Sequence, residues 1–444
     1  MLRCIRHSRL LLAASLAIAA GCRPASNPPA APSAAQAADR AALKASGATF
    51  RPGPAAGGAA APGEWPNWRG PTHDGISGET GWTSDWPEEG PAQLWTAQVG
   101  TGFSSMAVSQ GRLYTMGHRG GNDSVFCFDA ATGETLWEHS YACELVDNLH
   151  EGGPAATPTV DEGRVYTLSK EGHLFALDSL TGAVIWQQEL QRLLGVEQCE
   201  WGFSCSPLVL GERLIVEAGR TAALDKSSGE LIWQTDAYRA GYGSPVAFDH
   251  EGQTLIAVLN NDCLLVVRAD DGAEVAQHPW ETDYATTATT PIVSGDTIFI
   301  SSGYNRGCAL VKLSGGELEV VYAHREMSNH MNNCVLWRGH LYGFDGNSNN
   351  RRLVNLVCMD HASGEIRWNQ DGLGCGSLMA ADGKLLLLGD QGELAIARAA
   401  PDGYEELSRA RVLGGRTWTV PVLSGGRIYC RNAAGDLVCL DVSG

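Results

Sequence analysis

The sequence predicts an all-β fold, namely an eight-bladed β-propeller whose blades are four-stranded antiparallel sheets. Two sequence patterns alternate along the chain, and each consists of two strand-like runs separated by a tight turn. One pattern reads VFCFDAATGETLW and ends at Trp137; it recurs at Trp186, Trp233 and Trp368, with weaker copies from Leu264, Cys308 and Leu394 and a truncated copy at the end of the chain. The other pattern, for example SSMAVSQGRLYTM, has eight copies. The chain also contains 54 glycines, which suits a fold with many tight turns.

The N-terminus precedes the repeats and has the composition of an export signal. Residues 1–21 combine three arginines with the apolar stretch LLLAASLAIAAG, which is too short to span a bilayer as a mature helix. Small residues directly before Cys22 resemble a bacterial lipobox, which implies cleavage before Cys22 and lipidation of its thiol. Ordinary signal cleavage with Cys22 as a free thiol is the alternative. Residues 22–63 are rich in Ala, Pro and Gly, so we expect a disordered tether.

The segment WPNWRGPTHDGIS, which begins at Trp65, follows the tether and lies outside the repeats. We interpret it as the clasp through which the chain enters a propeller at residues 64–444. Trp65 and Trp68, with Trp82 and Trp86, are expected to pack along the edge or underside of the ring, where the termini meet. Arg69 would satisfy backbone carbonyls there, and the His-Asp-Gly run would shape a turn rather than bind a metal.

The tryptophans that end the repeat are predicted to pack between neighbouring blades, because a side chain of this size can fill the wedge between two sheets. The expected set is Trp95, Trp137, Trp186, Trp233 and Trp368. The last repeat, LVCLDVSG, stops before its tryptophan strand, and PAQLWTAQVG carries such a strand with no upstream partner. Strand 93–99 is therefore predicted to complete the last blade, which closes the ring and removes two exposed sheet edges.

Candidate functional residues gather in the segments that cross from the outer strand of one blade to the inner strand of the next. All these crossings open on one face, around the central channel, and ligand sites favour such mouths. The residues expected at a ligand or partner site are His150, Glu151, Trp201, Tyr242, Asp283, Tyr284, Asn329, His330, Asn332, Arg416 and Trp418. The alternative is an ordinary solvated rim whose polar groups satisfy the backbone.

The sequence does not indicate a catalytic or metal site. His150, Glu151 and His330 have suitable ligand types, but no short spacing connects them. No G-x-S-x-G elbow is present. Arg351 and Arg352 follow a polar loop and are interpreted as a solvated turn.

Charge and cysteine content limit the possible partners and the disulfides. The net charge of -18 disfavours nucleic acid and anionic lipid surfaces. Of the 13 cysteines, Cys4 leaves with the signal, and removing Cys22 as well leaves an odd number. Cys199 and Cys205 could close a short loop. Those in apolar strands, namely Cys127, Cys263, Cys358 and Cys439, are expected to be buried free thiols.

The repeated motif A/C-x-D-x-x-T/S-G-x-x-x-W resembles the repeat of quinoprotein-type eight-bladed propellers, over about residues 65–444. One branch of that family contains alcohol dehydrogenases that depend on pyrroloquinoline quinone (PQQ). Another contains cofactor-free repeat proteins, including the envelope lipoprotein BamB. The opening W-P-x-W-R-G-P segment is similar to that of exported "PQQ-like" repeat proteins. Unlike the dehydrogenases, this sequence has no adjacent cysteine pair, no long insertions and no recognisable set of calcium ligands.

The resemblance implies a lipid-anchored propeller on the periplasmic side of the cell envelope, held in the outer membrane. We expect a monomeric, non-catalytic binding or scaffold protein that presents its channel face to a protein or glycan partner, without nucleic acid and without a cofactor. A PQQ- and calcium-dependent oxidoreductase with an altered pocket is the alternative, so catalysis stays undecided at this point.

Overall fold

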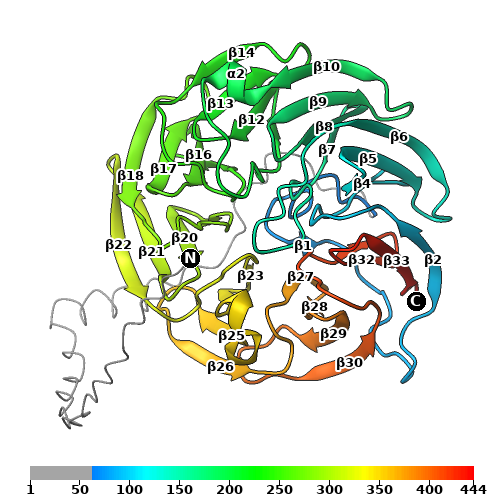
Figure 1. Cartoon of the computed structure of the whole chain (residues 1–444). Helices are drawn as coiled ribbons and strands as arrows, with labels where there is room; N and C mark the ends of the chain where they lie inside the picture. The colour runs from blue at the N-terminus through cyan, green and yellow to red at the C-terminus, as the bar shows by residue number, and fades with distance from the viewer. Residues whose placement is uncertain (1–62) are drawn as a thin grey trace, which may run out of the picture. The chain divides into compact units, whose positions relative to one another are not determined.

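The computed structural model describes residues 63–444, and these form eight β-sheets that follow one another around a ring (Figure 1). The expected export signal at residues 1–21, the lipidation site Cys22 and nearly all of the expected tether lie outside the described residues. Within residues 63–444, no helix is long and apolar enough to cross a membrane. The predicted all-β, eight-bladed propeller is confirmed.

Each of the first four blades is a four-stranded antiparallel sheet whose strands follow the chain from the channel outward. Their strands are β3 (Ala107–Ser109), β4 (Arg112–Arg119), β5 (Asn122–Asp129) and β6 (Thr135–Ala142); β7 (Thr159–Asp161), β8 (Arg164–Leu168), β9 (His173–Asp178) and β10 (Val184–Glu189); β11 (Leu208–Leu210), β12 (Arg213–Glu217), β13 (Thr221–Asp225) and β14 (Leu231–Gln234); and β15 (Val246–His250), β16 (Gln253–Leu259), β17 (Cys263–Arg268) and β18 (Glu274–Pro279). A short helix, α2 (Leu190–Leu194), follows β10.

Blades five to eight continue the same order. Their strands are β19 (Ile292–Ser294), β20 (Thr297–Ser302), β21 (Gly307–Ser314) and β22 (Glu317–His324); β23 (Val335–Trp337), β24 (His340–Asp345), β25 (Asn355–Asp360) and β26 (Ile366–Gln370); β27 (Ser377–Ala381), β28 (Lys384–Leu388), β29 (Glu393–Arg398) and β30 (Glu406–Arg411); and β31 (Val422–Ser424), β32 (Arg427–Arg431) and β33 (Asp436–Asp441) with β2 (Gln93–Gln98). The 3-10 helix η1 (Ser348–Leu353) lies between β24 and β25.

The last blade combines both ends of the described chain. Strand β2 pairs antiparallel with β33, and Trp95 lies opposite Cys439. The predicted closing strand is therefore confirmed, one residue shorter than expected. Strand β2 thereby covers the open edge of β33, and the ring closes between the eighth blade and the first without a gap.

Contacts across each turn explain the repeated D-x-x-T/S-G-x-x-x-W motif. In blade 1 the Asp129 carboxylate accepts hydrogen bonds from the Thr132 backbone N–H at 2.8 Å and from its hydroxyl at 3.0 Å. Gly133 follows at φ 74°, a left-handed conformation that glycine adopts without strain. The outer strand then changes register by one residue just before Trp137. Such a bulge re-aims the side chains around it.

The repeat tryptophans pack against the next blade, as predicted. Trp186 of blade 2 donates its indole N–H to the Lys226 carbonyl of blade 3 at 3.0 Å. Its ring lies so close to Gly229 that a Cβ there would be 2.7 Å from a ring carbon. The same pairing of a tryptophan with a turn glycine of the next blade recurs for Trp95, Trp137 and Trp233. The motif's glycine and tryptophan are thus partners across the blade interface.

Trp368 makes the equivalent hydrogen bond to the Ala400 carbonyl at 2.9 Å, although it is only partly buried. Blade 5 has Tyr322 in place of a tryptophan, and its hydroxyl donates to the His361 carbonyl of blade 6 at 3.0 Å. All five predicted interblade tryptophans therefore occupy the expected position.

The segment that begins at Trp65 lies inside the ring, which corrects part of the clasp prediction. The backbone of Trp65 forms a two-way bridge with Val108 on the inner strand of blade 1. Further on, β1 (Ile76–Ser77) pairs in parallel with the inner strand β27 of blade 7, and Figure 1 shows β1 on the channel side of that blade. We call residues 63–80 the channel plug.

The plug enters and leaves the channel at the face opposite the crossings. The Gly63 carbonyl accepts the Ser424 hydroxyl, and Glu79 accepts the backbone N–H of Gly426 at 3.0 Å, both at the first hairpin turn of blade 8. We expected Trp65 and Trp68 to pack at the edge or underside of the ring. They lie in the channel instead, where the inner strands offer apolar surface. Thr83, between Trp82 and Trp86, bonds the Val442 carbonyl near the C-terminus, so that part of the prediction is confirmed.

Arg69 is the central residue of the plug. Its guanidinium is buried and donates to the carbonyls of His73, Asp74 and, in blade 6, Cys334. The Asp74 carboxylate accepts the Ile76 backbone N–H at 2.9 Å, so the Asp-Gly run forms the predicted turn. These contacts fix the loop that reverses the plug inside the channel.

All cysteines in residues 63–444 are free thiols. The possible Cys199–Cys205 loop is absent: Cys205 is buried, and its sulfur accepts the Glu217 backbone N–H instead. Cys127 and the other cysteines predicted in apolar strands are buried free thiols, as expected.

Candidate functional site

A cavity of about 470 Å³ opens at the mouth of the central channel. Its walls come from crossings between blades, which the sequence identified as the place to look. Five of the expected residues line it, namely His150, Trp201, Tyr242, His330 and Trp418. These residues lie far apart in the sequence, and the ring brings them together.

The plug closes the cavity at its inner end. Trp68 lines the cavity, and its indole N–H donates to the Thr290 hydroxyl of blade 5 at 3.0 Å. The Trp65 bridge and the buried Arg69 hold the chain on either side of Trp68. Because the plug enters from the opposite face, the cavity is a blind pocket rather than an open pore.

Aromatic contacts organise the wall near blades 1 and 8. Phe103 stacks on Trp418 with ring centroids 5.3 Å apart, and His150 meets Phe103 edge-on at 5.4 Å. The Arg416 guanidinium lies 4.4 Å from the Trp418 ring centroid and pairs with Glu151 at 2.6 Å. Two expected rim residues, Glu151 and Arg416, thus pair beside Trp418 with both side chains partly exposed, and neither lines the cavity.

The opposite part of the wall contains two further aromatic groups. Trp201 meets Tyr242 at 5.7 Å, and Tyr304 meets His330 edge-on at 4.7 Å. Tyr284, which is exposed, packs against Tyr304 with ring centroids 4.7 Å apart and extends the aromatic surface toward solvent. Such rings offer a large rigid contact area with few rotatable bonds to immobilise.

One cation lies in the lining, and no carboxylate does. Lys170 is only 3% exposed, and its ammonium donates to the Trp201 carbonyl at 2.7 Å. Burial lowers the pKa of Lys170 to about 8 and the pKa of both His150 and His330 to about 4. Within the described chain the lining includes no Asp or Glu. The pocket is therefore aromatic, with one buried positive charge at neutral pH.

Three expected site residues lie away from the lining. The amides of Asn329 and Asn332 are buried and donate to the carbonyls of Phe344 and Gly376, both at 2.9 Å, so they hold the crossing backbone. Asp283 is exposed and outside the cavity. Arg351 and Arg352 are exposed in the turn of blade 6 that contains η1, as expected, and Arg351 also pairs with the buried Asp390 carboxylate at 2.8 Å.

Among the aromatic and charged residues of the lining, sequence reasoning missed four, namely Trp68, Phe103, Lys170 and Tyr304. Lys170 and Tyr304 lie in the turns between the second and third strands of their blades, at the same end of the blade as the crossings. Successive turns of an antiparallel sheet alternate between its two ends, so the sequence pattern was sufficient to place both residues on this face. Phe103 lies in the crossing before the first hairpin, so the argument that selected the other crossing residues applied to it as well.

The residues at the channel mouth do not fit calcium-bound PQQ. Calcium takes oxygen ligands, usually including carboxylates, and the lining formed by the described residues contains no carboxylate. The whole sequence also has no adjacent cysteine pair of the kind that the PQQ dehydrogenases carry. The chemistry of this pocket is therefore that of its aromatic rings and its one ammonium group.

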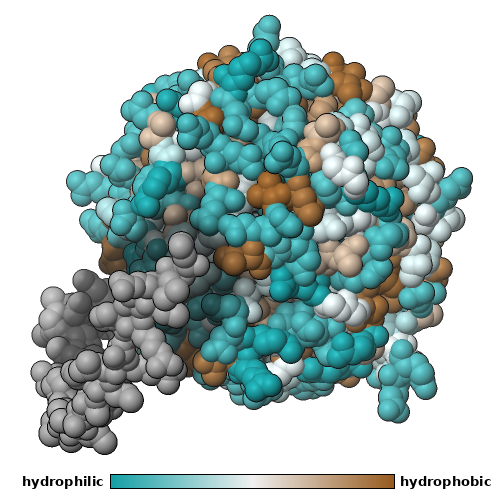
Figure 2. Space-filling view, viewed as in Figure 1, coloured by the Kyte–Doolittle hydropathy of each residue, from teal (hydrophilic) through white to brown (hydrophobic). Residues whose placement is uncertain are grey.

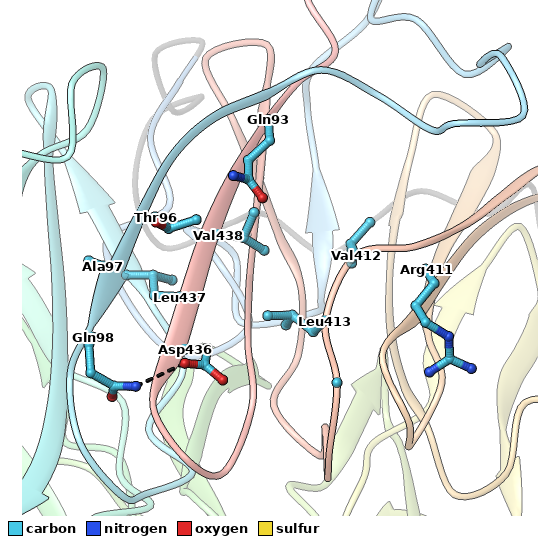
Figure 3. A pocket seen from close by; sticks show the side chains of 11 residues that line it. Gln93, Thr96, Ala97, Gln98, Arg411, Val412, Leu413, Asp436, Leu437 and Val438 are labelled. Atoms are coloured by element: carbon cyan, nitrogen blue, oxygen red, sulfur yellow. Dashed lines mark hydrogen bonds between the residues drawn. The ribbon is translucent and has the colours of Figure 1, made fainter.

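A second depression lies between the outer strands of blades 7 and 8 (Figure 3). It is an open groove lined by short apolar side chains such as Val412 and Leu437, and Gln98 bonds Asp436 at 2.9 Å at one end. The groove has no convergent set of reactive or charged groups, so the channel-mouth cavity is the better candidate. In Figure 2, hydrophilic residues cover most of the visible face, and apolar residues appear near its centre and at several places along its edge.

Fold, repeat and plugged channel define an eight-bladed propeller of the quinoprotein type. Within that class, the chain belongs to the family described as outer membrane protein assembly factor BamB, whose model matches residues 72–192 and 121–370. The BamB of Moranella endobia (strain PCIT) is 23% identical over 300 residues, which are 64% of this chain and 74% of that protein. The BamB of Yersinia pestis is 26% identical over 228 residues, or 48% of this chain and 53% of that protein, so the match spans about half its length.

Solved structures confirm the fold alone. BamB from Moraxella catarrhalis superposes with a TM-score of 0.59 at 17% identity, covering 79% of this chain and 99% of that one. Quinohemoprotein alcohol dehydrogenase from Comamonas testosteroni superposes with a TM-score of 0.65 at 13% identity, covering 86% and 81%. The structural neighbours therefore include members of both branches of the family that the repeat motif resembles, the BamB proteins and the alcohol dehydrogenases.

Proposed function

We propose that the protein is a non-catalytic scaffold that acts in outer membrane protein assembly, lipid-anchored on the periplasmic side of the envelope. Membership of the BamB family supports the assembly role, and the sequence of residues 1–22 supports export and the anchor. The observation that carries the proposal is the aromatic pocket at the channel mouth, which contains binding surface but no reacting pair of side chains in its lining.

The partner that fits this pocket is a protein segment with an apolar or aromatic anchor and an acidic group. Aromatic walls suit an inserted apolar side chain, and the buried Lys170 ammonium, which has no carboxylate partner among residues 63–444, favours a negative charge. Leu149 lines the rim and is 84% exposed, and Leu353 at the end of η1 is also exposed. An exposed apolar rim around a pocket is typical of a protein–protein site.

Site-specific photocrosslinking in intact cells tests this proposal. A photoreactive residue is placed at Leu149, on the channel-mouth face, and for comparison at Leu180, an equally apolar exposed position in a turn on the opposite face. We expect Leu149 alone to yield an adduct with a component of outer membrane protein assembly, identified by mass spectrometry. Trp418→Ala should abolish that adduct, because it removes one wall of the pocket.

The outcomes separate the alternatives. Equal adducts at Leu149 and Leu180, or none at either, would remove the channel mouth as the partner site. A glycan partner would be identified instead if the protein gives no protein adduct, is retained on immobilised envelope glycans, and loses that retention in Trp418→Ala. The oxidoreductase alternative is tested by supplying PQQ and calcium: a bound cofactor absorbing in the near ultraviolet, together with alcohol-dependent dye reduction, would refute the scaffold proposal.

A further inference from the structure

A group of metal-ligating side chains lies between blades 1 and 2, outside the channel-mouth pocket. Cys143 follows the outer strand β6 of blade 1, Glu171 belongs to the turn between β8 and β9 of blade 2, and His173 is the first residue of β9. One ligand atom from each of the three lies within 4.8 Å of the others. Nothing in the binding role proposed above uses these residues.

Local structure fixes the imidazole in a suitable orientation. The Ser169 hydroxyl lies 2.9 Å from Nδ1 of His173 and accepts the His173 backbone N–H at 3.0 Å. On the other side of the ring, Nε2 lies 3.5 Å from the Glu189 carboxylate. A proton on Nε2 that faces Glu189 leaves a lone pair on Nδ1, which is the nitrogen nearer Glu171, at 3.9 Å. Carboxylate partners of this kind fix the tautomer of metal-binding histidines.

A buried carboxylate supplies a second, independent observation. Asp123 at the start of β5 is 1% exposed; its Oδ1 lies 2.9 Å from Nδ1 of His118, but its Oδ2 has no hydrogen-bond partner. Burial raises the pKa of this carboxyl, while the neighbouring His118 and Cys143 side chains lower it. Burial, and then the Asp123 charge, raise the pKa of the Cys143 thiol. In the β5–β6 ladder Asp123 lies opposite Tyr141, two residues before Cys143, so the side chains of Asp123 and Cys143 are on the same face of the sheet. A buried oxygen without a partner is costly.

We propose that Cys143, Glu171, His173 and Asp123 form a binding site for a divalent transition-metal ion of the zinc class. One thiolate, one imidazole and two carboxylates are ligands that Zn²⁺ accepts in a four-coordinate site. Ligand atoms around tetrahedral zinc are roughly 3.3–3.8 Å apart, given bond lengths of ~2.0–2.3 Å. The ligand atoms of Cys143, Glu171 and His173 lie within 4.8 Å of one another and reach that spacing by side-chain shifts of about 1 Å, with Nδ1 releasing the Ser169 hydroxyl. The proposal requires Asp123 to turn its unpartnered Oδ2 toward these three groups.

The surroundings favour zinc over calcium or magnesium. Those ions prefer oxygen ligands only, whereas this site includes a thiol and an imidazole. The ion has a route from solvent, because the side chains of Glu171 and His173 are 26% and 20% exposed. His118, bonded to Asp123, acts as an orienting residue behind the ligand. Bound zinc would deprotonate Cys143 and join blade 1 to blade 2.

Zinc titration of the purified, EDTA-treated protein tests the site. We expect one Zn²⁺ per chain by calorimetry, and binding at least ~10-fold weaker for Cys143→Ser and for His173→Gln. Cys199→Ser is the matched control: it removes the partly exposed thiol of the blade 2–3 crossing and should leave zinc binding unchanged. Co²⁺ in place of zinc should give a thiolate charge-transfer band that Cys143→Ser abolishes.

Asp123→Asn keeps the size of the side chain, so it distinguishes a lost ligand from a lost fold. This variant should melt normally without metal and lose most of the zinc-dependent rise in melting temperature. Failure of the wild-type protein to bind Zn²⁺ at micromolar concentration would overturn the proposal. Zinc binding that survives Cys143→Ser, or that Ca²⁺ displaces equally well, would also overturn it.

Discussion

A single added methyl group should test whether the turn glycine and the tryptophan of the repeat act as partners. Gly229 lies in a turn of blade 3 at φ 73°, and a Cβ at this position would be 2.7 Å from a ring carbon of Trp186. Gly229→Ala therefore combines backbone strain with a steric clash. Gly211 lies in another turn of the same blade at φ 58°, and its Cβ would meet nothing within 4 Å. Gly211→Ala has the strain without the clash.

The backbone strain and the steric clash contribute separately to the loss in free energy of unfolding. Left-handed backbone at a non-glycine residue costs about 1–2 kcal/mol, and this cost applies to both variants. Overpacking a buried site costs a further 1–3 kcal/mol, as an order of magnitude. We expect Gly211→Ala to lower the free energy of unfolding by about 1–2 kcal/mol and Gly229→Ala by about 2–5 kcal/mol. Urea unfolding followed by circular dichroism measures both.

A double-mutant cycle isolates the contact. In a Trp186→Ala background the indole is absent, so Gly229→Ala should cost only the strain, and the coupling energy should equal the clash. Gly211→Ala should cost the same in either background. If Gly229→Ala is no more destabilising than Gly211→Ala, or if its effect does not depend on Trp186, the glycine–tryptophan partnership is wrong.

Three further outcomes follow from the fold. Trp233→Ala should lower the free energy of unfolding by about 3–5 kcal/mol, whereas Ile232→Ala, a truncation at an exposed neighbour on the same strand, should change it little; comparable losses would show that Trp233 is not packed. Deletion of residues 436–444 removes the strand that pairs with β2 and should lower the melting temperature of the whole ring; an unchanged melting temperature would contradict ring closure. Burial raises the pKa of the Glu217 carboxyl from 4.5 to about 8, so this carboxyl binds a proton more tightly in the folded state than in the unfolded state. The stability that this proton contributes should therefore fall as pH rises from 4.5 through 8, and Glu217→Gln should flatten that dependence; an identical pH profile would refute it.

Repetition made most of the fold predictable. The strong copies of the motif, which end at Trp137, Trp186, Trp233 and Trp368, contain an aspartate that caps the turn, a glycine that turns it and a tryptophan that meets the next blade. Local chemistry and packing therefore favour the same fold. The closing strand was predictable for the same reason, because Trp95 carries a fragment of the motif without an upstream partner. Buried cysteines such as Cys127 followed from their apolar strands.

The plug could not be placed from the sequence, because its position depends on surfaces built elsewhere. Strand β1 has only two residues and pairs with a strand about three hundred positions later. Arg69 is satisfied by carbonyls of its own loop and of blade 6, a combination with no sequence signature. The tryptophans indicated an apolar segment, but an edge and a channel offer such a segment similar contacts.

The pocket was partly predictable because strands repeat and crossings do not. Eight similar blades produce a channel with nearly uniform walls, and a uniform channel cannot orient an asymmetric partner. Differences between the crossings supply that asymmetry: Trp418 and His150 lie on one side, Trp201 and Tyr242 on another. Trp68 then closes the channel from the far side and converts a passage into a site with a definite depth. The non-repeated residues of the chain are therefore where recognition of the proposed partner would be encoded.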